Sequence, residues 1–382
     1  MKKYKIAFAT GSRADYGIVR NYISKLNEDS EIDFSVLVTG ALLDEKFGNA
    51  VKIVEQDGFK IAHACKVSNN MDCTADTISI MATVLDDFGR YFQDNRYDLL
   101  IILGDRYEIY TLSIAAAMQR IPILHLHGGE ITLANYDEFI RHSITKMSTY
   151  HFTSTEEYRH RVIQLGENPE TVFYLGALGA ENCLNIDINN VPEELFDFNN
   201  GFTVLFHPET LNAISPVEQI EEVLKAIAPY TSDYKFIFIG SNADTHSGQI
   251  TQRVYEFCTN QDNCHFYSNL HPDGYHYLIK HSIALIGNSS SGIIEVPSLG
   301  SYTVNIGDRQ TGRVKSASIV DVKCDAVEIG NAIEYVIEHK CEPITDTPYY
   351  KANTAENYYK TTKQILIDIN KLVYKEFYDI KF

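Results

Sequence analysis

Short apolar runs alternate with stretches of helical period from one end of the chain to the other. This alternation is typical of parallel strands joined by helices that cover both faces of a sheet. The apolar runs of the first half predict strands at residues 5–10, 33–39, 98–103, 122–127, 151–153 and 172–175, with a weaker candidate at 60–64. Those of the second half predict strands at 202–206, 235–239, 265–267, 283–286 and 302–306. The fold class is therefore α/β.

The alternation lapses in a polar stretch, residues 185–192, which ends in a proline and is typical of a connection between domains. At 382 residues the chain also exceeds the size at which one hydrophobic core usually stops growing. We therefore expect a first domain of residues 1–184 and a second of residues 200–353. The tyrosine-rich residues 350–379 predict a helix with no strand after it, and we expect residues 354–382 to pack back onto the first domain.

The composition narrows the class of ligand. The formal net charge is −18, which argues against nucleic acid and anionic membranes as partners because both need a basic face. The seven cysteines are scattered without a C-x-x-C pair, which fits reduced thiols and gives no zinc motif. The apolar run at residues 6–10 is too short for a signal peptide, and no run approaches the ~20 residues that span a bilayer. We expect a soluble cytoplasmic protein in which a few arginines hold any anionic ligand.

The most informative stretch is residues 286–295, IGNSSSGIIE, which joins an apolar strand to a helix through small hydroxyl residues. Backbone N–H groups at a helix start attract an anion, Ser290 and Ser291 add short donors, and Gly292 lets a ligand approach the main chain. Glu295 lies one turn into the helix, where an acidic residue can accept hydrogen bonds from a ribose diol. The stretch predicts a nucleoside diphosphate site. Its structural alternative is an ordinary serine N-cap followed by an exposed glutamate.

Ionisable residues follow the strands of the first half, and in open α/β sheets ligands bind beyond the carboxyl ends of the strands. Arg13 follows the first strand, in a turn that lacks the G-x-G-x-x-G spacing of a dinucleotide site. Asp105 and Arg106 set a carboxylate and a guanidinium side by side after the strand at 98–103. Arg13 is placed to reach a phosphate, whereas Asp105 and Arg106 also fit a surface ion pair.

The next strand, at 122–127, carries two histidines in the string HLHGGE. Strand alternation predicts that His125 and His127 lie on one face, with Glu130 just beyond two glycines. Asp137 opens the following helix. A packed core histidine and a charge at a helix start are the structural alternatives, and a zinc site with Asp105 lacks a spaced third ligand.

The second half repeats the arrangement. His207 ends a strand and is followed by a proline, and Arg309 and Arg313 follow the strand at 302–306. Packing alone gives no reason for ionisable groups to collect at the same ends of successive strands, so together they indicate a site.

These motifs carry a family resemblance. The chain resembles the hydrolysing UDP-N-acetylglucosamine 2-epimerases of bacterial sialic acid synthesis, from the first strand to beyond Arg313. The strings that carry it are TGSRADYGIVR, LGDRYEI, HLHGGEITLANYDEFIRHSITKMS, TSTEEYRHRVIQLGE, FHPETL, FIFIGSNADT, IGNSSSGIIEVPSLG and NIGDRQTGRV. The last ~60 residues lack such a string.

The resemblance implies two Rossmann-like domains that face each other across a cleft, the GT-B fold, with the C-terminal helix returning to the first domain. It implies that UDP-N-acetylglucosamine and water give N-acetylmannosamine and UDP, for sialic acid and a sialylated capsule or surface glycan. It further implies a homo-oligomer, a homodimer or a dimer of dimers, without a redox cofactor. We also expect no metal site.

The family mechanism implies roles for the candidate residues. UDP leaves C1 in an anti elimination while a base removes the C2 proton, and water then adds to the 2-acetamidoglucal. Arg13 and Arg309 are the best candidates to hold the diphosphate, with Ser290 and Ser291, because charge-assisted hydrogen bonds contribute about 1.5–3 kcal/mol each. Arg106 and Arg313 are weaker candidates.

By position in the matching motifs, Asp105 and Asp137 are the catalytic carboxylates, and His207 lies near the leaving diphosphate or the sugar hydroxyls. One position departs from the family, because many relatives have a glutamate where this chain has His127. Either His127 or Glu130 takes over that role, and the sequence leaves the choice open. A histidine near its ordinary pKa serves as acid or base.

Five other functions compete. A non-hydrolysing 2-epimerase would return UDP to the glycal, and a hydrolysing relative for diacetamido 6-deoxy sugar nucleotides, in legionaminic acid synthesis, would differ in the pocket around C4 and C6. A GT-B glycosyltransferase would need an acceptor groove. A catalytically silent nucleotide-sugar sensor would gain nothing from Asp105, and a metal-dependent hydrolase would lose its activity with a chelator.

Overall fold

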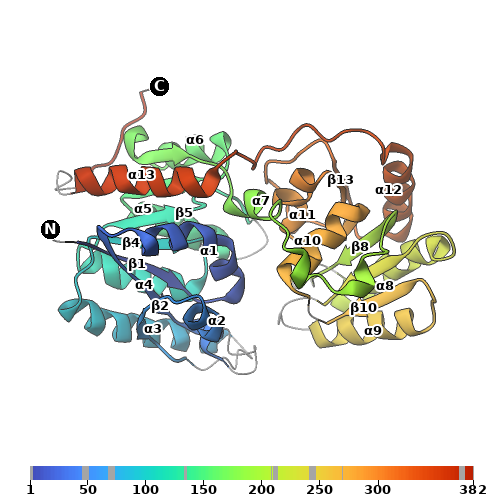
Figure 1. Cartoon of the computed structure of the whole chain (residues 1–382), viewed down its shortest axis with the longest axis horizontal. Helices are drawn as coiled ribbons and strands as arrows, with labels where there is room; N and C mark the ends of the chain where they lie inside the picture. The colour runs from blue at the N-terminus through green and yellow to red at the C-terminus, as the bar shows by residue number, and fades with distance from the viewer. Residues whose placement is uncertain are drawn as a thin grey trace. The chain divides into compact units, whose positions relative to one another are not determined.

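Two compact units make up the structure, a computed structural model (Figure 1). The first unit comprises Met1–Glu130, Asn135–Leu178 and Lys351–Phe382, and the second comprises Ile131–Ala134 and Gly179–Tyr350. No described helix is long and apolar enough to cross a membrane. The structure describes residues 3–44, 51–67, 74–132, 136–207, 209, 214–240, 247–268, 270–369 and 375–381.

A seven-stranded, wholly parallel sheet forms the centre of the first unit. In sheet order its strands are β3 (Ile61–Ala64), β2 (Ile32–Val38), β1 (Tyr4–Thr10), β4 (Leu99–Leu103), β5 (Ile123–Leu126), β6 (Tyr150–Thr153) and β7 (Val172–Tyr174). The helices of this unit are α1 (Arg13–Glu28), α2 (Val51–Gln56), α3 (Thr74–Asp94), α4 (Tyr107–Met118), α5 (Asp137–Met147), α6 (Glu156–Gln164) and α13 (Thr354–Asp368), with 3-10 turns η1 (Gly40–Leu43) and η3 (Pro169–Thr171).

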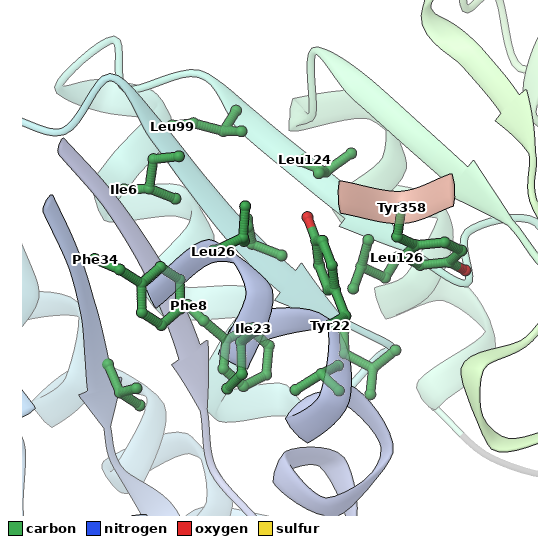
Figure 2. Packing of buried hydrophobic residues seen from close by; sticks show 14 of the residues in the cluster. Ile6, Phe8, Tyr22, Ile23, Leu26, Phe34, Leu99, Leu124, Leu126 and Tyr358 are labelled. Atoms are coloured by element: carbon green, nitrogen blue, oxygen red, sulfur yellow. The ribbon is translucent and has the colours of Figure 1, made fainter. Parts of the chain in front are cut away.

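Apolar side chains from both ends of the chain share one core of the first unit. Tyr22 of α1 and Tyr358 of α13 meet edge to face, with ring centroids 5.4 Å apart, over the strand residues Phe8 and Leu126 (Figure 2). The Tyr22 hydroxyl lies 2.7 Å from Thr362 Oγ1, and the Tyr358 hydroxyl donates to a backbone carbonyl at 2.8 Å. Burying two large rings with their hydroxyls bonded accounts for the return of α13 to this unit, as the sequence predicts.

The predicted C-terminal helix is shorter than expected. It ends at Asp368, and residues 375–381 carry no helix. Lys375 instead lies against the end of α5, where its ammonium donates to the carbonyl of Lys146 at 2.8 Å and pairs with Glu167 at 2.7 Å. A cation there satisfies carbonyls that a helix end leaves unpaired.

The second unit is built around a parallel sheet of six strands. Their order is β10 (Cys264–Tyr267), β9 (Phe236–Ile239), β8 (Gly201–Leu205), β11 (Ser282–Gly287), β12 (Tyr302–Ile306) and β13 (Ile319–Val322). The helices are α8 (Pro216–Ile227), α9 (Ser247–Thr259), α10 (Pro272–His281), α11 (Ser291–Ile294) and α12 (Ala326–His339), with 3-10 turns η4 (Ile188–Asn190), η5 (Glu193–Leu195), η6 (Ala228–Tyr230) and η7 (Val296–Leu299). Helix α7 (Leu178–Asn182) spans the division between the units.

Local sequence sets where these elements begin. Ser12 caps α1 by accepting from the backbone N–H of Asp15 at 3.1 Å. Ser215 and Glu218 form a capping box at the start of α8, with a proline at the first helical position. Such caps start a helix directly beyond a loop, so the residues of that loop are held in place.

Two sequence predictions differ from the structure here. The edge strand β13 has no predicted counterpart, because its four residues are only partly buried and include an aspartate. The polar stretch 185–192 lies inside the second unit, where Val191 is buried against Leu195 and Phe198. The six described cysteines are unpaired thiols, and Cys73 lies outside the described residues.

Candidate functional site

The strand order marks one position within each sheet where a ligand is expected to bind. The chain runs outward in opposite directions from β1 and β4 in the first sheet, and from β8 and β11 in the second. Ligands bind beyond the carboxyl ends of the strands at such a switch point. Arg13 opens the helix after β1, and the loops there carry Asp105 after β4, His207 after β8 and Ser290 after β11. Each sheet therefore places predicted site residues at its switch point.

A buried arginine joins two of these loops in the first unit. The Arg141 guanidinium of α5 pairs with the Asp105 carboxylate and donates to the His127 carbonyl at 3.0 Å. Arg141 is 4% exposed, so both contacts form away from bulk water. One cation thus fixes Asp105 relative to the loop after β5, a role that the sequence does not reveal because 36 residues separate Arg141 from Asp105.

His127 and Glu130 form a second buried pair, in the loop after β5. His127 Nδ1 lies 3.3 Å from Glu130 Oε1, and the Ser154 hydroxyl donates to the same Oε1 at 2.7 Å. All three residues are buried. His127 has a left-handed backbone with φ 62°, which non-glycine residues rarely adopt. Strained backbone of this kind concentrates at functional sites.

His125 has a structural role. Strand β5 ends at Leu126, so strand alternation does not extend to His127, and the shared face predicted for the two histidines loses its basis. The His125 ring is fully buried, with Nε2 2.8 Å from the Gly104 carbonyl and Nδ1 3.2 Å from Thr145 Oγ1. Burial holds the pKa of His125 well below its usual range, so the ring stays neutral.

Arg106 belongs to a charged cluster beneath the loop after β1. Its Nε donates to the fully buried carboxylate of Glu108, which lies under Gly11, where a Cβ atom would come within 2.3 Å of Glu108 Oε1. Burial raises the pKa of the nearby Asp15 to about 6, against the opposing effect of Arg106. The Arg106 charge is therefore largely balanced by carboxylates, which weakens it as a phosphate ligand.

The remaining candidates of the first unit lie at helix starts. Arg13 is exposed in the first turn of α1, and Asp137 is the partly buried first residue of α5. Asp137 lies one helical turn before Arg141, so a single helix presents both.

In the second unit a buried amide holds His207. The Asn288 side chain accepts from the backbone N–H of His207 at 2.8 Å and donates to its carbonyl at 2.9 Å. Asn288 is fully buried and follows β11 directly, so it ties the ends of β8 and β11 together. The sequence offered a signal for it, because a polar residue follows a wholly apolar strand.

The loop after β12 is hydrogen-bonded to the backbone carbonyl of Asn288. The Arg309 guanidinium donates to the Asn288 carbonyl at 3.1 Å, and the Gln310 amide donates there at 2.9 Å. Glu209 Oε1 accepts from the backbone N–H groups of Asp308 and Arg309, both at 3.0 Å. Arg309 thus lies beside the serine loop, and Arg313 lies half-buried four residues further on.

The serine loop itself is short and tightly packed. Ser290 is the N-cap of the four-residue helix α11, and the Ser291 hydroxyl lies 2.6 Å from the Tyr275 hydroxyl. A Cβ on Gly292 would come within 2.8 Å of Thr303, whose hydroxyl donates to the Gly292 carbonyl at 2.7 Å. Close packing on β12 is a structural reason for Gly292, and its role in letting a ligand approach the main chain stays a prediction.

Glu295 ends α11 with a partner of its own. Its Oε2 lies 3.2 Å from His276 Nε2, and its side chain is 18% exposed. A partly exposed carboxylate held by a neighbouring ring suits a hydrogen bond to a polar ligand. Sequence reasoning missed His276, as it missed Arg141, Ser154, Asn288 and Glu209, because each acts through residues distant in the chain.

The described residues bring together no group of three or more histidine, cysteine, aspartate or glutamate side chains able to hold a metal ion. In the motif strings, residues 133–135, 208, 210–211 and 241–245 lie outside the described residues. Two parallel α/β domains, each with a switch point in its sheet, define the GT-B fold.

Comparison with known proteins gives the family. A model described as UDP-N-acetylglucosamine 2-epimerase matches residues 24–363. The chain is 46% identical to the polysialic acid biosynthesis protein P7 of Escherichia coli, over 98% of this chain and 97% of that protein. It is 34% identical to the hydrolysing GDP/UDP-N,N'-diacetylbacillosamine 2-epimerase of Campylobacter jejuni, over 84% and 85%. The fold matches the UDP-GlcNAc 2-epimerase of Neisseria meningitidis, solved with UDP-GlcNAc bound, at a TM-score of 0.78 and 17% identity, over 94% and 100%. The chain belongs to the UDP-N-acetylglucosamine 2-epimerase family.

Proposed function

We propose that this enzyme converts UDP-N-acetylglucosamine and water into N-acetylmannosamine and UDP, the first step of sialic acid synthesis. The 46% identity to a polysialic acid biosynthesis protein over nearly both full lengths supports this substrate. The structural observation that carries the proposal is the Arg141 bridge, which holds Asp105 and His127 together at the switch point of the first sheet. A carboxylate and an imidazole there supply the groups that the chemistry needs.

In the first half of the reaction the C1–O bond breaks and UDP leaves with its electron pair. Loss of the C2 proton then gives the C1=C2 double bond of 2-acetamidoglucal. The C2–H bond is not acidic, so stabilising the departing diphosphate lowers much of the barrier. Arg13, Arg309, Ser290 and Ser291 hold this charge in the proposal, with Glu295 on the ribose. Arg106, paired with Glu108, and Arg313 are secondary candidates.

In the second half, water adds at C1 and a proton is delivered to C2 from the other face of the ring. Two groups on opposite sides of the sugar are needed, each worth about 10²–10⁴ in rate. Asp105, Asp137 and the His127–Glu130 pair are the proton-transfer groups of the proposal, and His207 lies by the leaving diphosphate. The net reaction changes no oxidation state, so it calls for no redox cofactor.

The same proposal places the enzyme in the cytoplasm as a homodimer, or a dimer of dimers, that supplies a sialylated capsule. The name of the Escherichia coli relative supports the glycan role. Light scattering on the purified protein checks the assembly, and a monomer at working concentration would overturn that part.

A diacetamido sugar nucleotide is the second candidate substrate. The relatives from Campylobacter jejuni and Legionella pneumophila, 34% and 33% identical, are named as hydrolysing N,N'-diacetylbacillosamine 2-epimerases. The two substrates differ at C4 and C6 of the sugar, away from the C1 and C2 atoms that react. The same residues could therefore act on either compound, and turnover is measured with both compounds on one protein preparation.

A proton NMR time course in D₂O tests the function. With UDP-N-acetylglucosamine we expect UDP and N-acetylmannosamine that carries deuterium at C2. Undeuterated N-acetylglucosamine with UDP would indicate simple hydrolysis. UDP-N-acetylmannosamine would indicate a non-hydrolysing epimerase, and turnover of the diacetamido compound alone would move the assignment to the second candidate.

A further inference from the structure

His127 is held at its backbone on both sides. Its N–H donates to the Phe152 carbonyl at 2.8 Å, and its own carbonyl accepts from the Arg141 guanidinium at 3.0 Å. With φ at 62° these bonds keep a non-glycine residue in a left-handed conformation. The side chain therefore leaves the main chain in one fixed direction.

The ring of His127 has two different nitrogens. Nδ1 lies 3.3 Å from Glu130 Oε1, and that oxygen also accepts from the Ser154 hydroxyl at 2.7 Å. Nε2 has no hydrogen-bond partner among the described residues. It is also shielded from water, because His127 is only 7% exposed. Glu130 is 2% exposed and Ser154 is fully buried, so the pair is shielded from bulk water.

This asymmetry fixes the chemistry of the ring. A carboxylate beside Nδ1 favours the tautomer with its hydrogen on Nδ1, and it stabilises the imidazolium that forms when Nε2 takes a proton. A buried nitrogen without a partner is unfavourable unless a ligand supplies one. The Asp105 carboxylate, by contrast, is paired with the Arg141 guanidinium.

We propose that His127 is the catalytic base at C2 and that Glu130 is a positioning residue acting through it, with Ser154 holding Glu130. This rests on the proposed function. In the elimination, Nε2 takes the C2 proton, the C2–H electron pair becomes the C1=C2 double bond, and the C1–O pair leaves with UDP. The proton rests on the imidazole, next to Glu130, until it passes to solvent.

A double-mutant cycle tests this assignment. The variants are His127→Asn, which suits a left-handed backbone, Glu130→Gln, and the two combined. We expect kcat to fall about 10²–10⁴-fold for His127→Asn and about 10–100-fold for Glu130→Gln, with KM within a few-fold. The combined variant should match His127→Asn alone. Multiplying losses would overturn the proposal, because Glu130 would then act on the substrate itself.

Chemical rescue gives an independent readout. His127→Gly also fits the left-handed backbone and leaves a ring-sized space. Added imidazole should restore part of kcat when Glu130 is intact, and at least tenfold less when Glu130→Gln is also present. Equal rescue in both backgrounds, or none in either while UDP still binds, would contradict the paired roles.

The controls separate this inference from the function. Wild-type turnover of UDP-N-acetylglucosamine is measured in the same series, and its absence would overturn the proposed function. UDP binding by calorimetry and the thermal unfolding midpoint report whether each variant folds. Ser154→Ala, which loses one hydrogen bond to Glu130, should lower kcat less than Glu130→Gln and leave UDP affinity unchanged.

Discussion

The switch points of the two sheets are built from different chemistry. In the first unit charged side chains contact one another, as Asp105 contacts Arg141 and Arg106 contacts Glu108. In the second unit side chains bond mainly to backbone groups, as the Asn288 amide holds the backbone of His207 and the Glu209 carboxylate accepts from the backbone N–H of Arg309. Paired charged side chains can move protons, whereas ordered backbone groups at a loop can bind an anion. We therefore expect proton transfer in the first unit and nucleotide binding in the second.

Asp105→Asn is expected to have the largest effect, because it changes a charged pair of the first unit. The amide keeps an oxygen that accepts from Arg141 but loses the charge and the basicity of the carboxylate. We expect kcat to fall by about 10²–10⁴-fold while UDP affinity stays within a few-fold. Steady-state kinetics and calorimetry measure the two. Near-normal turnover would show that Asp105 takes no part in the chemistry.

The double variant Ser290→Ala with Glu295→Ala should instead weaken UDP binding, which the same calorimetry measures.

Arg141→Met tests whether the first site depends on its buried cation. Removing the guanidinium leaves the Asp105 carboxylate and the His127 carbonyl without their donor in a buried setting. Breaking a buried pair in this way costs about 3–5 kcal/mol in the free energy of unfolding. Denaturant unfolding measures it. Arg90→Ala, which removes an exposed partner of Asp86, is the matched control and should leave stability nearly unchanged.

The sequence predicts the fold well because its strands are buried on both faces and appear as apolar runs. The strand at Tyr302–Ile306 has the predicted bounds, and most others differ by one residue at an end. The mostly half-buried strand β13 lacks this signal, and the C-terminal helix ends earlier than its polar, tyrosine-rich pattern predicts. The returning C-terminal helix is confirmed, because its tyrosines complete the core of the first unit.

The site is predictable only in part, because strand ends are visible in a sequence and side-chain partners are not. Asp105 and His127 follow from their position after apolar runs. The residue that bridges them, Arg141, lies 36 residues after Asp105 in the sequence, and no local pattern marks it. The left-handed backbone of His127 likewise arises from tertiary hydrogen bonds. The sequence shows that these polar residues follow strand ends, and their division into hydrogen-bonded partners comes only from the structure.

The pH dependence of the free energy of unfolding tests the charged contacts of Glu167 in the first unit. This buried carboxylate contacts His151 at 3.0 Å, Lys146 at 2.6 Å and Lys375 at 2.7 Å. Burial raises its pKa, but these three groups outweigh burial and lower the pKa to about 2. A lowered carboxylate pKa gives stability that is fully present above the unfolded pKa of about 4.5 and is lost as the pH falls toward 2.

Glu167→Gln should therefore reduce the free energy of unfolding by about 3 kcal/mol at neutral pH, and the deficit should shrink between pH 4.5 and 2. Urea unfolding at a series of pH values measures it. Glu356→Gln, which removes a surface carboxylate paired with Lys25, is the control and should leave the slope nearly unchanged. A pH-independent deficit for Glu167→Gln would show that its charge is not what holds the C-terminal segment.

Asn288→Ala tests the second unit, where the smallest effect is expected. It removes both hydrogen bonds to the His207 backbone and leaves a buried N–H and carbonyl unpaired, at about 1–3 kcal/mol. Because Arg309 and Gln310 both donate to the Asn288 carbonyl, the loops around the serines should loosen together. We expect UDP affinity to fall about tenfold with kcat little changed.

Asn305→Ala is the matched control. It removes another buried asparagine of this sheet, which is bonded to Asp321 on β13, and it should lower stability without changing UDP affinity. For Asn288→Ala, a fall in kcat equal to that in affinity would mean that the second unit also takes part in the proton chemistry, and the division between the two sites would fail.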